Sequence, residues 1–363
     1  MVRIKELLQH RDEWLSFIGI SLLCFACYSN YTVVYAALPA IQEEFHANLS
    51  LLQSIEKIYF LMICALATIM GMLGDIYGRK RVLHVGVGIF IIASVIVGSA
   101  PNINCLYWGR LIQGIGAAII FPLGLALLPQ SFPEKKQDNA MIDLENGAGL
   151  VFILSPGFVG LILAYLSWRW VFFINISIVL LGYLLCLKSI NESHETNYAL
   201  SLNIKSMLSF FLGVIFGFAA GCFAGTIVFL NSLYVQVMKS QPSQLFAFCI
   251  LHVMPIILII VVFWVESLIA RLSFIKTFLS TLIVVCLVSL AQLFSHNYGT
   301  LFYIIFLFIL LKLMWIRNNT ISIAFAQRAV GNECISITTG VMVTMFNIGF
   351  ATAISHLSTR LPS

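Results

Sequence analysis

The chain has 363 residues, of which 60% are hydrophobic and only 10% are charged, and its mean hydropathy is +0.99. Soluble domains carry about 25% charged residues, so this composition excludes a soluble enzyme or binding domain. The net charge of +5 comes from Lys and Arg scattered among polar connections rather than gathered with aromatic residues in one patch, which excludes a nucleic-acid-binding protein.

Long apolar runs separated by short polar connections predict helices that cross a membrane. A helix needs about 20 apolar residues to cross a hydrocarbon layer of about 30 Å, and lipid offers no hydrogen bonds to an open backbone. We therefore expect an all-α, polytopic membrane protein whose first apolar run is a retained helix rather than a cleaved signal peptide. Eleven spans are expected, at residues 15–37, 53–74, 83–100, 105–128, 141–166, 169–187, 205–238, 245–268, 276–295, 299–326 and 334–357.

The polar connections predict the orientation and the division of the chain. With the N-terminus in the cytoplasm, thirteen Lys and Arg fall in cytoplasmic segments and four in segments on the other side, which agrees with the positive-inside rule. The longest polar connection follows the sixth span. We therefore expect an N-terminal six-helix bundle at 1–188, a cytoplasmic linker at 189–204 and a C-terminal bundle of about five helices at 205–363.

Small and charged residues gather where the second expected span meets the cytoplasm. The glycines and the acid recur at three- and four-residue spacing, so they share one helix face and allow another helix to approach closely. An acid followed by a basic turn can form a charge-paired gate at a helix end, whereas the plainer interpretation is a positive-inside anchor with solvated charges. The residues of this gating motif are Gly71, Gly74, Asp75, Gly78, Arg79 and Lys80.

The fourth expected span contains an arginine. Arg110, Gln113 and Gly114 share one helix face, and an Arg within a span costs about 2.5–3.5 kcal/mol on insertion scales. Arg110 is therefore expected to face a polar cavity or a partner. The alternative is that its side chain snorkels to the nearby membrane edge.

Proline and glycine occur together in the fifth expected span. Pro156 removes a helical hydrogen bond and bends the helix axis, and the neighbouring Gly157 and Gly160 permit close packing around the bend. We expect a hinge or a tight interhelical contact here, the alternative being a kink without functional consequence.

These motifs together resemble the major facilitator superfamily, and within it the drug/proton antiporter branch. Residues 71–83 are similar to that family's loop motif between helices two and three, and residues 110–118 to its fourth-helix motif, which the family uses in proton coupling. Residues 155–160 resemble its fifth-helix antiporter motif, although Ser155 and Val159 replace the usual glycines. The resemblance implies two helical bundles, with the substrate between them near the bilayer midplane.

The first expected span carries the main departure from this family. Residues 30–39 resemble the first-helix signature of the fourteen-helix exporters, which usually begins with an acid, whereas this chain has Asn30. An Asn cannot release a proton, so the usual carrier of coupling is missing. Glu56 is another acid, but its neighbour Lys57 allows the interpretation of a simple interfacial pair. Eleven spans are also one fewer than the family's common core, which suggests a shortened transporter.

Tyrosines and amides are expected to line a substrate cavity. Such residues suit amphipathic, often cationic molecules through stacking and cation–π attraction, whereas the alternative places the tyrosines in the aromatic belt at the membrane interface. The cavity candidates are Tyr28, Asn30, Tyr31, Tyr35, Tyr59, Asn231, Tyr234 and Gln236.

The expected function is proton-coupled efflux of drugs or metabolites across a bacterial inner membrane. Three alternatives stay open: transport without proton coupling, uptake of a compound such as a siderophore, and a shortened chain that does not transport. Neither an enzymatic site nor a metal or cofactor is expected, and Cys24 and Cys27 are interpreted as small core side chains. The expected partners are a small-molecule substrate and the lipid bilayer, with the chain a monomer.

Overall fold

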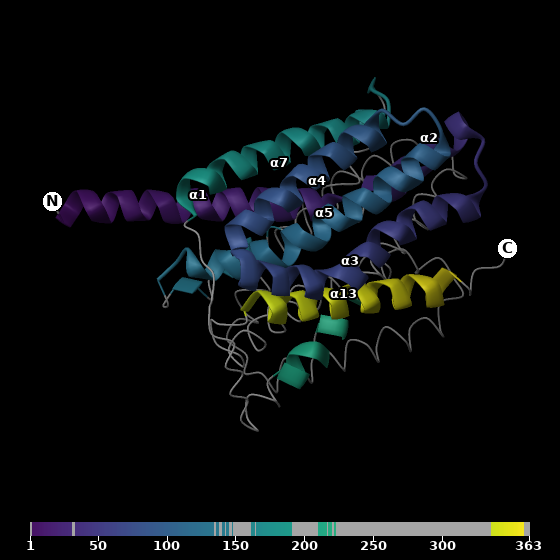
Figure 1. The fold of residues 1–363 in the computed structure, drawn as a ribbon. Coiled ribbons are helices and arrows are strands. Elements are labelled where there is room, and N and C mark those ends of the chain that lie inside the picture. The colour runs from purple at the N-terminus through teal and green to yellow at the C-terminus, as the bar shows by residue number, and fades with distance from the viewer. Residues whose placement is uncertain are drawn as a thin grey trace, which may run out of the picture.

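The computed structural model of the protein is a set of helices packed side by side (Figure 1). The N-terminal part of helix α1 (Val2–Ser29) projects beyond the bundle, and helix α13 (Ile335–Ser358) lies along helix α3 (Leu49–Tyr77). Every regular element in the described part of the chain is helical, which confirms the all-α fold class. The structure describes residues 2–30, 33–133, 136–137, 140–141, 143–144, 147, 161–163, 165–190, 210–215, 217–219, 221–222 and 335–358.

The C-terminal end of the first expected span, 15–37, is wrong. Helix α1 (Val2–Ser29) begins earlier, and after a turn at Asn30 the separate helix α2 (Val33–Phe45) begins. The side-chain amide of Asn30 donates a hydrogen bond to the carbonyl oxygen of Ala26 at 2.8 Å. An Asn that bonds a helical carbonyl in this way competes with the backbone ladder, so the chain leaves the helix here.

Side-chain caps define where the next helices begin. Helices α3 (Leu49–Tyr77) and α5 (Ile103–Gln130) follow Asn48 and Asn102, whose side-chain oxygens accept from the backbone N–H three residues on, at 2.8 Å and 2.9 Å. Asn is among the best N-cap residues because it satisfies a donor that the helix leaves unpaired. Helix α4 (Arg79–Gly98) follows α3 with a single residue between them.

Five of the described helices are long and apolar enough to cross a membrane. They match the second, third, fourth, sixth and eleventh expected spans, which confirms a multi-pass membrane fold. Helix α1 is not among them, because charged and polar residues occupy its first half. The total of eleven spans, the linker at 189–204 and the division into two bundles rest mostly on residues outside the described ranges and stay predictions. The five stretches are Ser54–Tyr77 in α3, Arg79–Gly98 in α4, Ile103–Gln130 in α5, Arg169–Ser189 in α7 and Ile335–Ala353 in α13 (Ile335–Ser358).

Helix α3 occupies the middle of the described bundle. It packs against α5 and α4 and also against α13, which lies more than 250 residues later in the chain, while α1 packs on α7 and α5 (Figure 1). Glycine permits close approaches between these helices. A Cβ atom on Gly19 of α1 would lie 2.9 Å from the carbonyl oxygen of Gly182 in α7, which is the small-residue packing typical of membrane helices.

Candidate functional site

The acid and the arginine of the gating motif form a buried ion pair. Asp75 lies in the last turn of α3 and Arg79 is the first residue of α4, and their side chains are 0% and 1% exposed. The Nε and Nη2 atoms of Arg79 lie 2.9 Å and 2.8 Å from the same Asp75 oxygen, Oδ1. The interpretation of solvated charges is therefore wrong for these two residues. We refer to the Asp75–Arg79 pair and its contact with α13 as the latch.

The other oxygen of Asp75 reaches a distant part of the chain. Its Oδ2 atom accepts a hydrogen bond of 3.0 Å from the backbone nitrogen of Ile337, in the first turn of α13 and 262 residues away in sequence. The first N–H groups of a helix have no partner within it and carry a partial positive charge. The carboxylate of Asp75 thus holds together the end of α3, the start of α4 and the start of α13.

The glycines of the motif give this corner its shape. Gly78 is the single residue between α3 and α4, and its φ of 103° is a value that other residues rarely adopt. Gly71 faces the backbone carbonyl of Ser336 in α13, and Gly74 faces the side chain of Leu123 in α5. A side chain at either position would separate α3 from its neighbour.

Lys80 connects the latch to the sixth expected span. Its Nζ atom donates to the carbonyl oxygens of Leu187 at 3.0 Å and of Ile190 at 2.5 Å, at the C-terminal end of α7. A positive charge there satisfies carbonyls that the helix leaves unpaired and complements its dipole. The basic turn after the latch is therefore a structural contact as well as a charge at the membrane edge.

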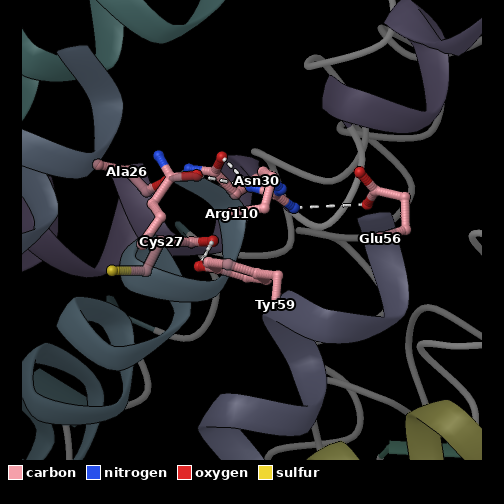
Figure 2. A network of polar contacts seen from close by, with 7 residues as sticks. Ala26, Cys27, Asn30, Glu56, Tyr59 and Arg110 are labelled. Atoms are coloured by element: carbon pink, nitrogen blue, oxygen red, sulfur yellow. Dashed lines mark hydrogen bonds and ion pairs between the residues drawn. The ribbon is translucent and has the colours of Figure 1, made fainter. Parts of the chain in front are cut away.

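Arg110 is the centre of a second polar cluster (Figure 2). The side chain is 0% exposed, so the snorkelling alternative is wrong. Its Nη1 atom donates to Asn30 Oδ1 at 3.0 Å and to Gln113 Oε1 at 2.7 Å, and its Nη2 atom lies 3.5 Å from Glu56 Oε2. The guanidinium carbon also lies 4.3 Å from the centre of the Tyr59 ring, within the range of a cation–π interaction. We refer to these residues as the arginine cluster.

The arginine cluster joins four helices. Asn30 follows α1, Glu56 and Tyr59 belong to α3, and Arg110 and Gln113 belong to α5. Helix α4 contributes through Ser94, whose hydroxyl accepts a hydrogen bond from the Gln113 side-chain amide at 2.9 Å.

Gly114 brings the two central helices of this cluster together. A Cβ atom on Gly114 would lie 2.7 Å from the carbonyl oxygen of Tyr59, so α5 can approach α3 this closely only with a glycine at that position. Gly114 therefore acts through packing, one helical turn from Arg110.

The sequence did not predict that Glu56 would belong to the arginine cluster. The interpretation as an interfacial pair with Lys57 is wrong, because Glu56 is 0% exposed whereas Lys57 is exposed and points elsewhere. Its three-residue spacing from Tyr59 puts both on one face of α3. That spacing is the only signal in the sequence, and it does not say which helix the face meets.

The other predicted site residues are only partly placed. Tyr28 is buried near the end of α1, and Tyr35 belongs to α2. Tyr31, Asn231, Tyr234 and Gln236 lie outside the described residues, as do the hinge residues Pro156, Gly157 and Gly160.

A cavity of about 220 Å³ lies beside α1. Its lining is mostly apolar, with the aromatic side chains of Phe17, Phe25 and Tyr28, and it includes one exposed acidic residue, Asp143. Aromatic faces beside a negative charge form an environment that can hold an amphipathic cation.

Apolar helices that enclose two buried charge clusters define this protein as a polytopic membrane protein with polar sites in its interior. The sequence profile of the Major Facilitator Superfamily matches residues 20–354, and the chain therefore belongs to the major facilitator superfamily, which confirms the family resemblance.

Similar proteins include named exporters and transporters. The drug efflux pump JefA of Mycobacterium tuberculosis is 34% identical over 182 residues, which is 50% of this chain and 36% of that protein. The lincomycin resistance protein of Streptomyces lincolnensis is 32% identical over 50% of this chain and 38% of that protein. The riboflavin transporter RibZ of Clostridioides difficile is 27% identical over 55% of this chain and 44% of that protein. The chain thus spans less than half the length of each of these relatives.

Proposed function

We propose that this protein is a secondary active transporter that exports small amphipathic molecules in exchange for protons. It works by alternating access in the inner membrane of a bacterium, with its N-terminus in the cytoplasm, as a monomer of two bundles. Membership of a transporter family supports the class of function, and the names of the drug efflux pump and the lincomycin resistance protein support the direction and the kind of substrate.

The observation that carries the proposal is the latch. A buried acid at the end of α3 bonds the first turn of α13 at 3.0 Å, so helices from the two halves of the sequence are tied at one end. Alternating access requires the halves to separate first at one membrane face and then at the other. A contact built from one carboxylate, one arginine and a helix terminus is small enough to break and re-form in each cycle.

Aromatic and acidic side chains support an amphipathic substrate, often a cation. The cavity beside α1 combines three aromatic rings with Asp143, and an attraction between a cation and an aromatic face contributes roughly 0.5–2 kcal/mol. The hinge in the fifth span, at Pro156, Gly157 and Gly160, would let that helix bend as the cavity opens.

Transport by the purified full chain in lipid vesicles tests the proposal. The chain is inserted into vesicles, and a pH gradient is then imposed in one direction or the other. We expect ethidium, a fluorescent aromatic cation, to move in the direction opposite to the protons, so that reversing the pH gradient reverses its movement. Empty vesicles under the same gradients are the control. Flux that does not respond to the pH gradient would show that transport is uncoupled rather than antiport. A complete absence of flux, for every cation tested, would contradict the proposal.

Asp75→Asn should lower this flux at least tenfold, because the change removes the negative charge that pairs with buried Arg79. Breaking a buried ion pair by removing one partner destabilises it by about 3–5 kcal/mol, and about 1.4 kcal/mol is a factor of ten. The variant is compared with Glu43→Gln, which removes an exposed acid on α2. Equal flux in the two variants, at equal amounts of inserted protein, would show that the latch is not part of the transport cycle.

A second candidate function is transport without proton coupling, or in the direction of uptake. Asn30 favours it, because the family's first-helix acid is absent and the neutral amide oxygen of Asn30 instead accepts the hydrogen bond from Arg110 at 3.0 Å. Under this function the vesicles would exchange ethidium down its own concentration gradient, and a pH gradient would have no effect.

A further inference from the structure

The carboxyl group of Glu56 lies beside Arg110, the arginine of the fourth expected span. It projects from the start of α3 toward α5, and its Oε2 atom is 3.5 Å from Arg110 Nη2 (Figure 2). Its other oxygen, Oε1, is buried and has no hydrogen-bond partner among the residues that the structure describes. We propose that Glu56 is the proton-binding residue of this protein and that it takes over the role that an acid at the position of Asn30 would have. The coupling part of this inference rests on the proposed antiport, whereas the protonation itself does not.

The surroundings of Glu56 favour a change of charge during the cycle. An ionised carboxylate removed from water is stable only if it is well paired, and here one oxygen has a single long contact while the other has none. Arg110 favours the ionised form, but it shares its donors with Asn30 and Gln113. A proton on Oε1 would remove the poorly paired negative charge without any rearrangement of Arg110.

Among the described residues, few other charged groups face this site. Arg110 is the single charged residue in the sequence of α5, and neutral Asn30 meets it from the end of α1. From α4 the Ser94 hydroxyl, which is also neutral, reaches the cluster through its hydrogen bond with Gln113. Between Ile335 and Ser358 helix α13 has no Asp, Glu, Lys or Arg in its sequence. Among the described residues the charge state of the arginine cluster is therefore decided by Glu56 alone.

The proton step changes the net charge of the cluster. With Glu56 ionised, its negative charge cancels the positive charge of Arg110. A proton taken from water forms an O–H bond on Glu56, and the cluster then carries one positive charge, because the guanidinium stays protonated and remains held by Asn30, Gln113 and the ring of Tyr59. Release of the proton to water on the other side of the membrane restores the neutral pair.

This change of charge provides a reason for exchange. A cationic substrate in the cavity beside α1, whose lining includes Tyr28 two residues before Asn30, is tolerated when the pair is neutral and is repelled when Glu56 is protonated. Since the interior of a membrane protein screens charge poorly, the repulsion acts over the width of a cavity. Binding of the proton and of the cation then exclude each other, which is the requirement for antiport.

Chemical labelling of the full chain tests the protonation. Dicyclohexylcarbodiimide adds to a protonated carboxyl group in an apolar environment and ends as a stable N-acylurea on that side chain, with no other reactant. Mass spectrometry of the labelled chain in detergent should find the adduct on Glu56, at a rate that falls by up to about tenfold for each unit of rising pH, as the protonated fraction does. Exposed Glu43 is the internal control and should not be labelled.

Glu56→Gln tests the coupling, since Gln has the same shape and a fixed neutral charge. Vesicles with this variant should exchange ethidium down its own gradient but lose accumulation driven by a pH gradient, whereas Glu43→Gln should accumulate it like the unchanged chain. Normal gradient-driven accumulation by Glu56→Gln, or absence of pH-dependent labelling on Glu56 in the unchanged chain, would overturn the inference. If the unchanged chain is labelled at Glu56 but ignores the pH gradient, the proposed antiport fails and the proton-binding site stands.

Discussion

At the residue scale, Arg110 shows how this chain keeps a charge inside a membrane helix. The guanidinium is fully buried, and its positive charge meets two amide oxygens, one carboxylate and one aromatic ring. No single contact would balance the loss of hydration, because a buried ion has to be paired and hydrogen-bonded on several sides. The sequence motif supplies Gln113 within the same helix, and the other partners come from α3 and the end of α1.

The backbone conformation of Gly78 leads to a testable prediction about stability. Its φ of 103° lies where a Cβ atom is strained, so Gly78→Ala should lower the free energy of unfolding by about 1–2 kcal/mol. Gly88→Ala is the matched control, since a Cβ atom at Gly88 would have nothing within 4 Å and the residue lies inside α4. There Ala should be neutral or stabilising by up to about 1 kcal/mol.

Thermal unfolding of the two purified variants in detergent measures both effects. The Gly78→Ala variant should melt below the unchanged chain and the Gly88→Ala variant at or above it. Equal melting temperatures for the two variants would mean that the turn between α3 and α4 tolerates a side chain.

At the element scale, α3 connects the two polar clusters. Glu56 lies near its start and Asp75 near its end, and nineteen residues of helix correspond to about 28 Å. Because a helix is a stiff rod, a tilt of α3 that opens the latch also changes the distance between Glu56 and Arg110. This helix therefore offers a mechanical path between the proposed proton-binding site and the proposed gate.

The junction of α2 with α7 supports a pH prediction at this scale. Glu44, near the end of α2 and outside the five candidate spans, accepts from Arg169 Nη1 and from the Trp168 indole nitrogen, each at 2.7 Å. The hydrogen bond from Arg169, aided by that from Trp168, holds the pKa of Glu44 below its usual value. Because the folded-state pKa is lowered, the stabilisation is present above the pH where an unfolded Glu titrates, about 4.3. It is lost as the pH falls through the lowered value.

Glu44→Gln should therefore reduce stability at neutral pH and have little effect in acid. The pair is partly exposed, with side chains 40% and 27% accessible, so the difference at neutral pH should be about 0.2–1 kcal/mol. Melting temperatures of the variant and the unchanged chain, compared over a series of pH values, measure it. A difference that grows on acidification would contradict the prediction.

At the scale of the whole molecule, the contact between α3 and α13 is the surface that alternating access would have to open. The Thr68 and Thr344 hydroxyl oxygens are 3.0 Å apart across it, and a Cβ atom on Gly340 would lie 2.5 Å from the Ala67 carbonyl oxygen. Two helices this close slide or separate as units, because a tightly packed interface does not deform continuously.

A disulfide across this surface should stop transport. With the native cysteines replaced, Thr68→Cys combined with Thr344→Cys is expected to crosslink under mild oxidation, since the side chains already touch. Ethidium flux should then fall to the background of empty vesicles and return after reduction. The Thr68→Cys variant alone, treated with the same oxidant, is the control. Undiminished flux with the crosslink complete would show that α3 and α13 do not separate during transport.

The sequence by itself determined the class of the protein and five of its membrane helices, because hydropathy and helical periodicity are local properties of the chain. It also identified the latch residues Asp75 and Arg79, since both lie on one continuous stretch around Gly78. Only the tertiary structure decided their partner in α13, the break after Ser29 and the pairing of Glu56 with Arg110. Those contacts join residues tens to hundreds of positions apart, and packing rather than local pattern brings them together.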